Sequence, residues 1–144
     1  MTATFNKFNC FALNLGMKSM NLSATDVYKV ALVSIQPVAT WTTKASLTQV
    51  GSGNGYTTDG NGCTITSWSL TGGTAKWVLV SPTLWTCITN PMGPFEWAVL
   101  MDVTSNGAQG DLIGWWDYGS EVNMVVGDTF TVTFDSTNGV IQLT

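Results

Sequence analysis

Two apolar segments joined by a polar linker constrain this chain more than any other feature of its sequence. Residues 94–103 and 111–118 have the length of strands and are almost continuously apolar, and residues 104–110 between them are rich in Ser, Asn, Gly and Gln. This pattern predicts an antiparallel hairpin with a long polar connection. Strands that are apolar on both faces are typical of the centre of a sheet or of a subunit contact. Because side chains alternate along a strand, the adjacent Trp115 and Trp116 must point to opposite faces.

The chain carries few charges for its size. Only 10% of its 144 residues are charged, 44% are apolar, and seven are Trp, whereas an average soluble domain is about 25% charged. This length suits one domain with a core of its own. A weakly charged surface favours assembly with copies or partners over a free monomer.

Charge and histidine content disfavour several functional classes. The basic residues are five isolated Lys, there is no Arg, and the net charge is −4, so binding to nucleic acid or to an anionic membrane is disfavoured. The chain has no His, the commonest general base and metal ligand. No nucleotide-binding or hydrolase motif occurs. We therefore expect no catalytic residue, no cofactor and no metal.

Paired carboxylates are the catalytic arrangement that most needs weighing, because glycosidases require only two. Glu96 and Asp117 each adjoin a Trp and could face a sugar, whereas Asp102 and Asp111 flank the predicted turn, where acidic residues are ordinary. We favour structural roles for all four.

The three cysteines, Cys10, Cys63 and Cys87, are widely spaced and form no CxxC motif. Three reduced thiols in a protein that folds in a reducing cytosol are the favoured interpretation, with one disulfide and one free thiol as the alternative. We expect neither a secretory signal at the N-terminus nor a membrane span.

Residues 4–16 carry the best helical pattern of the chain, with Thr4 as a candidate N-cap and Gly16 as a candidate left-handed end. The apolar stripe consists of Phe5, Phe8, Ala12 and Leu15, with Phe11 beside it. We expect a short amphipathic helix on the edge of a β domain, with a partner-binding helix as the alternative.

Short strands are predicted for most of the remaining chain. Two hairpins are expected, one joining residues 63–70 to 75–80 with a bulge near Ser67, and one joining residues 129–135 to 140–143. The other predicted strands cover residues 25–35, 85–88 and 121–126, residues 45–50 are either a strand or a helical turn, and residues 51–62 are a loop.

The fold class that follows is mainly β, in a single domain. Residues 1–24 would form the N-terminal helix or arm, and residues 25–144 an antiparallel β-sandwich or jelly-roll-like barrel, with one short N-terminal helix in all.

Short motifs spread over nearly the whole chain form a set that is specific together and weak one by one. They lie at residues 5–11, 30–32, 37–40, 53–56, 93–95, 98–100, 112–120, 127–132 and 138–140. In these motifs the chain resembles a family of small structural proteins of tailed bacteriophages, identified here with the capsid decoration (cement) proteins.

The resemblance implies a non-enzymatic protein of the virion that is made in the host cytoplasm. It would bind the outer capsid surface, bridge subunits of the major capsid protein and associate with itself, as a homotrimer. The side chains expected to contact partners are Phe5, Phe8, Phe11, Trp97, Trp115 and Trp116. Deletion of residues 1–16 is expected to abolish shell binding and to leave the domain folded.

A carbohydrate-binding or host-adhesion module of a phage tail or fibre is the alternative function. Exposed aromatic rings on a β-sandwich stack well on sugar faces, and the chain is rich in Trp.

Overall fold

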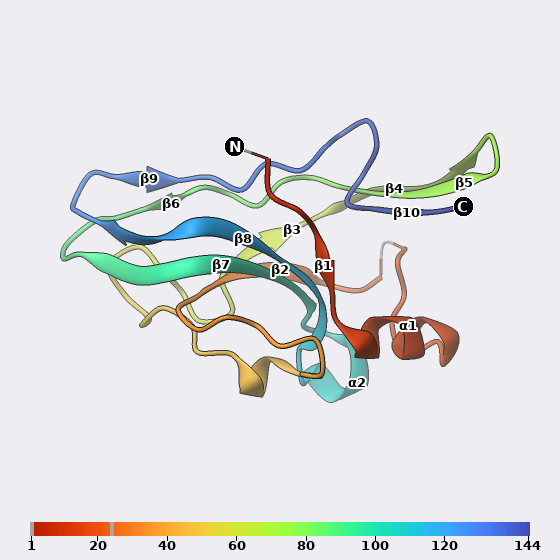
Figure 1. The fold of residues 1–144 in the computed structure, drawn as a ribbon, viewed down its shortest axis with the longest axis horizontal. Coiled ribbons are helices and arrows are strands. Elements are labelled where there is room, and N and C mark those ends of the chain that lie inside the picture. Colours follow the sequence, from red (N-terminus) through yellow and green to blue (C-terminus); the bar gives the residue numbers. More distant parts are fainter. Residues whose placement is uncertain (1, 24) are drawn as a thin grey trace.

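The computed structural model describes residues 2–23 and 25–144 and is mainly β, with antiparallel sheets (Figure 1). A five-stranded sheet has the order β1-β8-β7-β2-β3, a three-stranded sheet the order β10-β5-β4, and β6 pairs with β9. No sheet of the described residues closes into a barrel. The strands are β1 (Asn6–Lys7), β2 (Tyr28–Val33), β3 (Asn61–Cys63), β4 (Ile65–Thr71), β5 (Thr74–Leu79), β6 (Trp85–Thr86), β7 (Met92–Asp102), β8 (Asp111–Met124), β9 (Thr129–Phe130) and β10 (Ile141–Leu143).

The predicted central hairpin is confirmed, since β7 and β8 pair antiparallel and β7 also pairs with β2. The connection between them contains the four-residue helix α2 (Ser105–Ala108). The carboxylate of Asp102 accepts hydrogen bonds from the backbone N–H groups of Thr104 and Ser105, at 2.9 and 3.0 Å, and Asp111 accepts one from the Ser105 hydroxyl. The acidic residues at this turn therefore have the structural role that was predicted for them.

The five-stranded sheet is covered on both faces. On one face, β7 and β8 pack against residues of the two smaller sheets, among them Trp77 and Trp85. The opposite face packs against Phe8 and the partly buried Trp41 and Leu47. The two adjacent tryptophans of β8 point to these opposite faces, as predicted. The Trp115 ring contacts that of Phe8, whereas the Trp116 ring contacts those of Phe5 and Phe134.

The N-terminal helix is shorter than predicted, because its first turn is replaced by a strand. Helix α1 covers Asn9–Gly16, and β1 before it pairs with Gly114 and Trp115 of β8. Gly114 permits this pairing, since a Cβ atom there would lie 2.2 Å from the Phe5 ring. The helix does not end in a left-handed Gly16; Lys18, with φ 58°, takes that conformation. With α2, the described chain has two α-helices rather than the single one expected.

The predicted C-terminal hairpin is wrong in its partners. Strand β10 pairs with β5, and β9 pairs with β6. The turn after Asp135 does form, but Val140 donates its N–H to Trp77, 2.7 Å away. Gly139 lets the chain approach β5, because a Cβ atom there would lie 2.3 Å from the Trp77 carbonyl oxygen. The alternation along residues 130–134 is nevertheless confirmed, with Thr131 and Thr133 exposed and the apolar side chains turned inward.

The other hairpin is confirmed, including its bulge. Strands β4 and β5 pair antiparallel, and their register shifts between Ile65 and Ser67. The turn consists of Gly72 and Gly73, which both have positive φ, as a type I′ turn requires. Residues 45–50 combine the two predicted alternatives: they begin in the 3₁₀ turn Lys44–Ser46, and Gln49 then forms an isolated antiparallel bridge with Val33 at the end of β2.

The three cysteines are free thiols. Burial raises the pKa of the Cys63 thiol to about 12 and also raises the pKa of Cys10. Thiols of this kind are poor nucleophiles at neutral pH. Within the described residues, no helix has the length and apolar character needed to cross a membrane.

The position of Phe8 in the structure predicts that the N-terminal arm is part of the core. Replacement of this fully buried ring (Phe8→Ala) should lower the free energy of unfolding by about 3–5 kcal/mol. Leu13→Ala is the matched control, because Leu13 lies on α1 with 62% of its surface exposed, and should cost at most about 0.5 kcal/mol. Urea denaturation followed by tryptophan fluorescence measures both, and equal small effects would contradict this role of the arm.

Candidate binding groove

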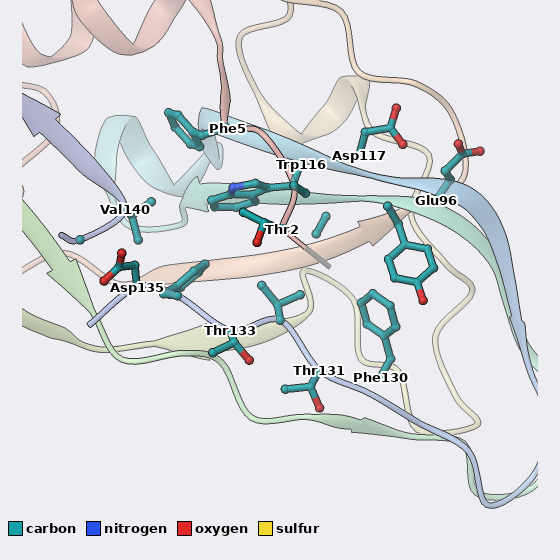
Figure 2. A pocket seen from close by; sticks show the side chains of 16 residues that line it. Thr2, Phe5, Glu96, Trp116, Asp117, Phe130, Thr131, Thr133, Asp135 and Val140 are labelled. Carbon is teal, nitrogen blue, oxygen red and sulfur yellow. The ribbon is translucent and has the colours of Figure 1, made fainter. Parts of the chain in front are cut away.

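A groove of about 690 Å³ lies between the five-stranded sheet and the segment that follows β9 (Figure 2). One wall is formed by the edges of β7 and β8, the other by the segment from β9 to Gly139 and Val140, and the N-terminal arm adds Thr2, Ala3 and Phe5. The groove thus joins three parts of the chain that are far apart in the sequence. Its remaining lining consists of Glu96, Ala98, Trp116, Asp117, Tyr118 and residues 130–135.

Aromatic rings line the groove along its length. The centroid of the Trp116 ring lies 5.2 Å from that of Phe5 and 5.5 Å from that of Phe134. A second group joins Tyr118 to Phe130, with 5.5 Å between their centroids. These distances fall in the range in which aromatic pairs attract one another beyond simple burial. Tyr118 keeps 43% of its surface exposed, so part of this aromatic lining faces solvent.

The polar groups of the groove are hydroxyls and carboxylates. Thr131 and Thr133 lie on the segment after β9. Figure 2 shows Asp135 toward one end of the groove, and Glu96 and Asp117 at the other end with their carboxylates on the far side of the β7 and β8 ribbons from the aromatic rings. No Lys or Arg is among the described residues that line it. The groove therefore presents hydroxyl groups beside its aromatic rings, with one carboxylate, that of Asp135, at its end.

The carboxylates at the two ends differ in their surroundings. Partial desolvation and the neighbouring Asp117 raise the pKa of Glu96, because two like charges oppose ionisation. Hydrogen bonds from Asn138 and Thr137 lower the pKa of Asp135. Asp135 is thus occupied in stabilising its own turn, and the unbalanced negative charge lies with Glu96 and Asp117.

This arrangement suits binding better than bond cleavage. A glycosidase places two carboxyl groups on either side of the scissile bond. Here the Asp117 carboxylate helps to raise the pKa of Glu96, both side chains point away from the aromatic rings, and Asp135 is held by its turn. No Cys or Ser lines the groove among the described residues. Its chemistry is that of stacking and hydrogen bonding.

The predicted contact residues are divided between the two faces of the sheet. Phe5 and Trp116 meet in the groove, and Trp115 lies on the other face, 4.5 Å from Phe8 between ring centroids. Trp97 is half-buried on that face with Trp115.

Two of the predicted contact residues are not on the surface. Phe8 and Phe11 are buried, with 0% and 2% of their surface exposed, because they pack against the sheet of their own chain. The prediction that these two rings contact a partner is therefore corrected: they fill the core. Deletion of residues 1–16 would therefore remove β1 and core packing. The expectation from the sequence, that the domain stays folded without these residues, is corrected accordingly.

Sequence reasoning missed the wall formed by residues 130–135 and 139–140. The alternation of residues 129–135 identified which side chains point inward, but not that they face Trp116. No periodic signal could have shown this, since the pairing that places the wall, β9 with β6 and β10 with β5, is non-local.

The described residues contain no group of three or more His, Cys, Asp or Glu side chains that could hold a metal ion. Comparison of the chain with models of protein families, with curated proteins and with solved structures finds no match. The interpretation of the groove therefore depends on its geometry.

The proximity of the two carboxylates predicts how Glu96 titrates. Asp117→Asn removes the neighbouring negative charge and should lower the pKa of Glu96 toward its ordinary value, because ionisation is no longer opposed. NMR titration of the Glu96 side-chain carboxyl carbon measures this shift. Asp135→Asn, at the other end of the groove, is the control and should leave the Glu96 titration unchanged; a similar shift in both variants would contradict the pairing.

Proposed function

We propose that this protein is a non-enzymatic structural protein of a bacteriophage virion. It binds the outer surface of the capsid and stabilises the shell by bridging subunits of the major capsid protein. The proposal is supported by the resemblance to structural proteins of tailed bacteriophages and by the exposed apolar side chains of a weakly charged protein.

The observation that carries the proposal is the amount of apolar side chain left exposed on a weakly charged protein. The exposed large hydrophobic residues are Leu13, Met17, Val27, Ile35, Val38, Trp68, Leu70, Val80, Leu84, Ile88, Tyr118, Val125, Val126 and Leu143. These residues lie on several elements rather than in one pocket. Burial of apolar surface at a contact contributes about 25 cal/mol per Å² to the free energy of binding. Such a surface suits many modest contacts that are repeated over a lattice.

The two-layered arrangement of the five-stranded sheet and the smaller sheets is consistent with a β-sandwich, and we propose this architecture as the scaffold. Partly exposed Phe5, Trp97, Trp115 and Trp116 stay candidate contact residues. Self-association is part of the proposal. The resemblance implies a homotrimer, and a dimer in solution would contradict that part without bearing on capsid binding. Neither nucleic acid nor membrane is a proposed partner.

The proposal predicts saturable binding to the shell at a fixed ratio to the major capsid protein. Cryo-electron microscopy of purified source virions should show density for this domain at repeated sites on the capsid surface. Because the surface carries few charges, binding of added protein to shells should change little between about 50 and 500 mM NaCl. Density confined to the tail, or binding that is lost with salt, would contradict capsid decoration by apolar contacts.

A second candidate function is saccharide binding in the groove, and a specific observation favours it. The solvent-facing ring of Tyr118, near Thr131 and Thr133, offers a stacking surface beside hydroxyl partners. A host-adhesion role on a tail or fibre would use this site.

Saccharide binding predicts a change of tryptophan fluorescence when host surface polysaccharide fragments are added, because Trp116 lines the groove. Tyr118→Ala should weaken such binding about tenfold, the equivalent of about 1.4 kcal/mol. Trp68→Ala is the matched control, since Trp68 is similarly exposed but lies outside the groove. Equal affinities of the Tyr118→Ala variant and the wild type would exclude the groove as the binding site.

A further inference from the structure

We propose that β4 is an interface strand, and that two copies of this chain pair through it as antiparallel neighbours about a two-fold axis at Ser69. The proposal does not depend on capsid or saccharide binding. It follows from the length, the backbone hydrogen bonding and the side chains of this one sheet edge.

Strand β4 differs from every other edge strand of the described sheets. The edge strands β1, β3, β6, β9 and β10 each contain two or three residues, whereas β4 contains seven, Ile65–Thr71. Proteins commonly protect long edges with charged residues or Pro. Residues 64–74 contain no charged residue and no Pro, so this long edge lacks this protection, whereas the part of β8 that extends beyond β1 carries Asp117 and Glu121.

The register of the β4–β5 hairpin shows which backbone groups of β4 are available. Thr71 and Thr74 flank the two-residue turn and form a hydrogen-bonded pair, and such pairs alternate along an antiparallel ladder. Ser69 therefore bonds to β5, while the N–H and C=O groups of Trp68 and Leu70 point away from it. Among the described strands, β4 has no neighbour on that side.

The side chains of Trp68 and Leu70 are also incompletely covered, although Trp68 borders a hollow that it shares with Leu15, Met20 and Leu22 of the segment at the end of α1. They lie opposite Trp77 and Ala75 in the register and thus on the core-facing side of the sheet, yet they are 40% and 72% exposed. Figure 1 shows the reason, since the β4–β5 hairpin projects past the ends of the five-stranded sheet. The inward face of this hairpin has more apolar surface than its own chain covers.

Antiparallel pairing centred on Ser69 would bond the unpaired backbone groups of β4 and would also cover the exposed side chains of Trp68 and Leu70. It places Trp68 of each copy opposite Leu70 of the other, in two pairs that exchange about four backbone hydrogen bonds. The same pairs bring an aromatic and an aliphatic side chain together across the strands, an arrangement that stabilises sheets. The strand is therefore complementary to itself, which is the property that a two-fold interface requires.

The charge distribution permits two copies to meet here although each has a net charge of −4. The nearest charged residue in the ladder is Lys76, which lies opposite Ser69. The two Lys76 side chains of a dimer would be separated by three strand spacings, about 14 Å, which is more than the screening length at physiological ionic strength. No carboxylate lies in either copy of β4.

The first test is the mass of the purified protein by analytical ultracentrifugation over about 1–200 µM. The expected result is a reversible dimer with twice the 15.4 kDa mass of one chain. Ser69→Lys should weaken the dimer at least tenfold, because it places two ammonium groups at the axis, whereas Ser136→Lys, at another exposed serine away from β4 and the groove, should not. A monomer throughout this range, or the trimer that the resemblance implies, would overturn the proposal.

The second test locates the axis. In a non-hydrogen-bonded pair the Cα atoms are about 4.5 Å apart, which suits a disulfide. Mild oxidation of Ser69→Cys should give a covalent dimer that the wild type and Ser136→Cys, an exposed position away from β4, do not form. A dimer in the ultracentrifuge without a cross-link through position 69 would show that another surface forms the contact.

Discussion

The β7–β8 ladder is the interaction on which the rest of the structure depends. Over residues 97–101 and 112–116 both strands are apolar on both sides, so neither face of this part of the sheet can be left to solvent. The two smaller sheets cover one face, and the N-terminal arm with the segment around Trp41 covers the other. The arm is therefore a structural element, because Phe8 and Trp115 complete the second core. An amphipathic helix that only lay on the surface would not cover this face of the sheet.

The two candidate interaction surfaces lie where this covering is incomplete. In the groove, Trp116 and Tyr118 belong to β8, but the segment after β9 covers them only partly and leaves space beside them. At the other surface, the β4–β5 hairpin extends past the large sheet and keeps Trp68 and Leu70 exposed. Both surfaces are thus aromatic extensions of the core. Their polar surroundings differ, because carboxylates lie only at the groove.

The sequence predicts which face of a strand a side chain occupies better than it predicts which strands pair. The alternation at Trp115 and Trp116, the bulge near Ser67 and the inward side chains of residues 130–134 are local properties, and each is confirmed. The extent of the helix in residues 4–16 and the partner of β10 depend on distant backbone, at Gly114 and Trp77, whose approach no local pattern reveals. The groove is built from three such distant segments, so the sequence identified Phe5 and Trp116 but not their common site.

Native-state hydrogen exchange is the most direct measurement of the central claim that the β7–β8 ladder holds the fold together. The amides of residues 97–101 and 112–116 that bond within the ladder should exchange slowest, and only through global unfolding. Their exchange free energy should equal the free energy of unfolding measured with denaturant. If these amides exchanged through a smaller local opening while another part of the chain stayed protected, the ladder would not be the element on which the other parts depend.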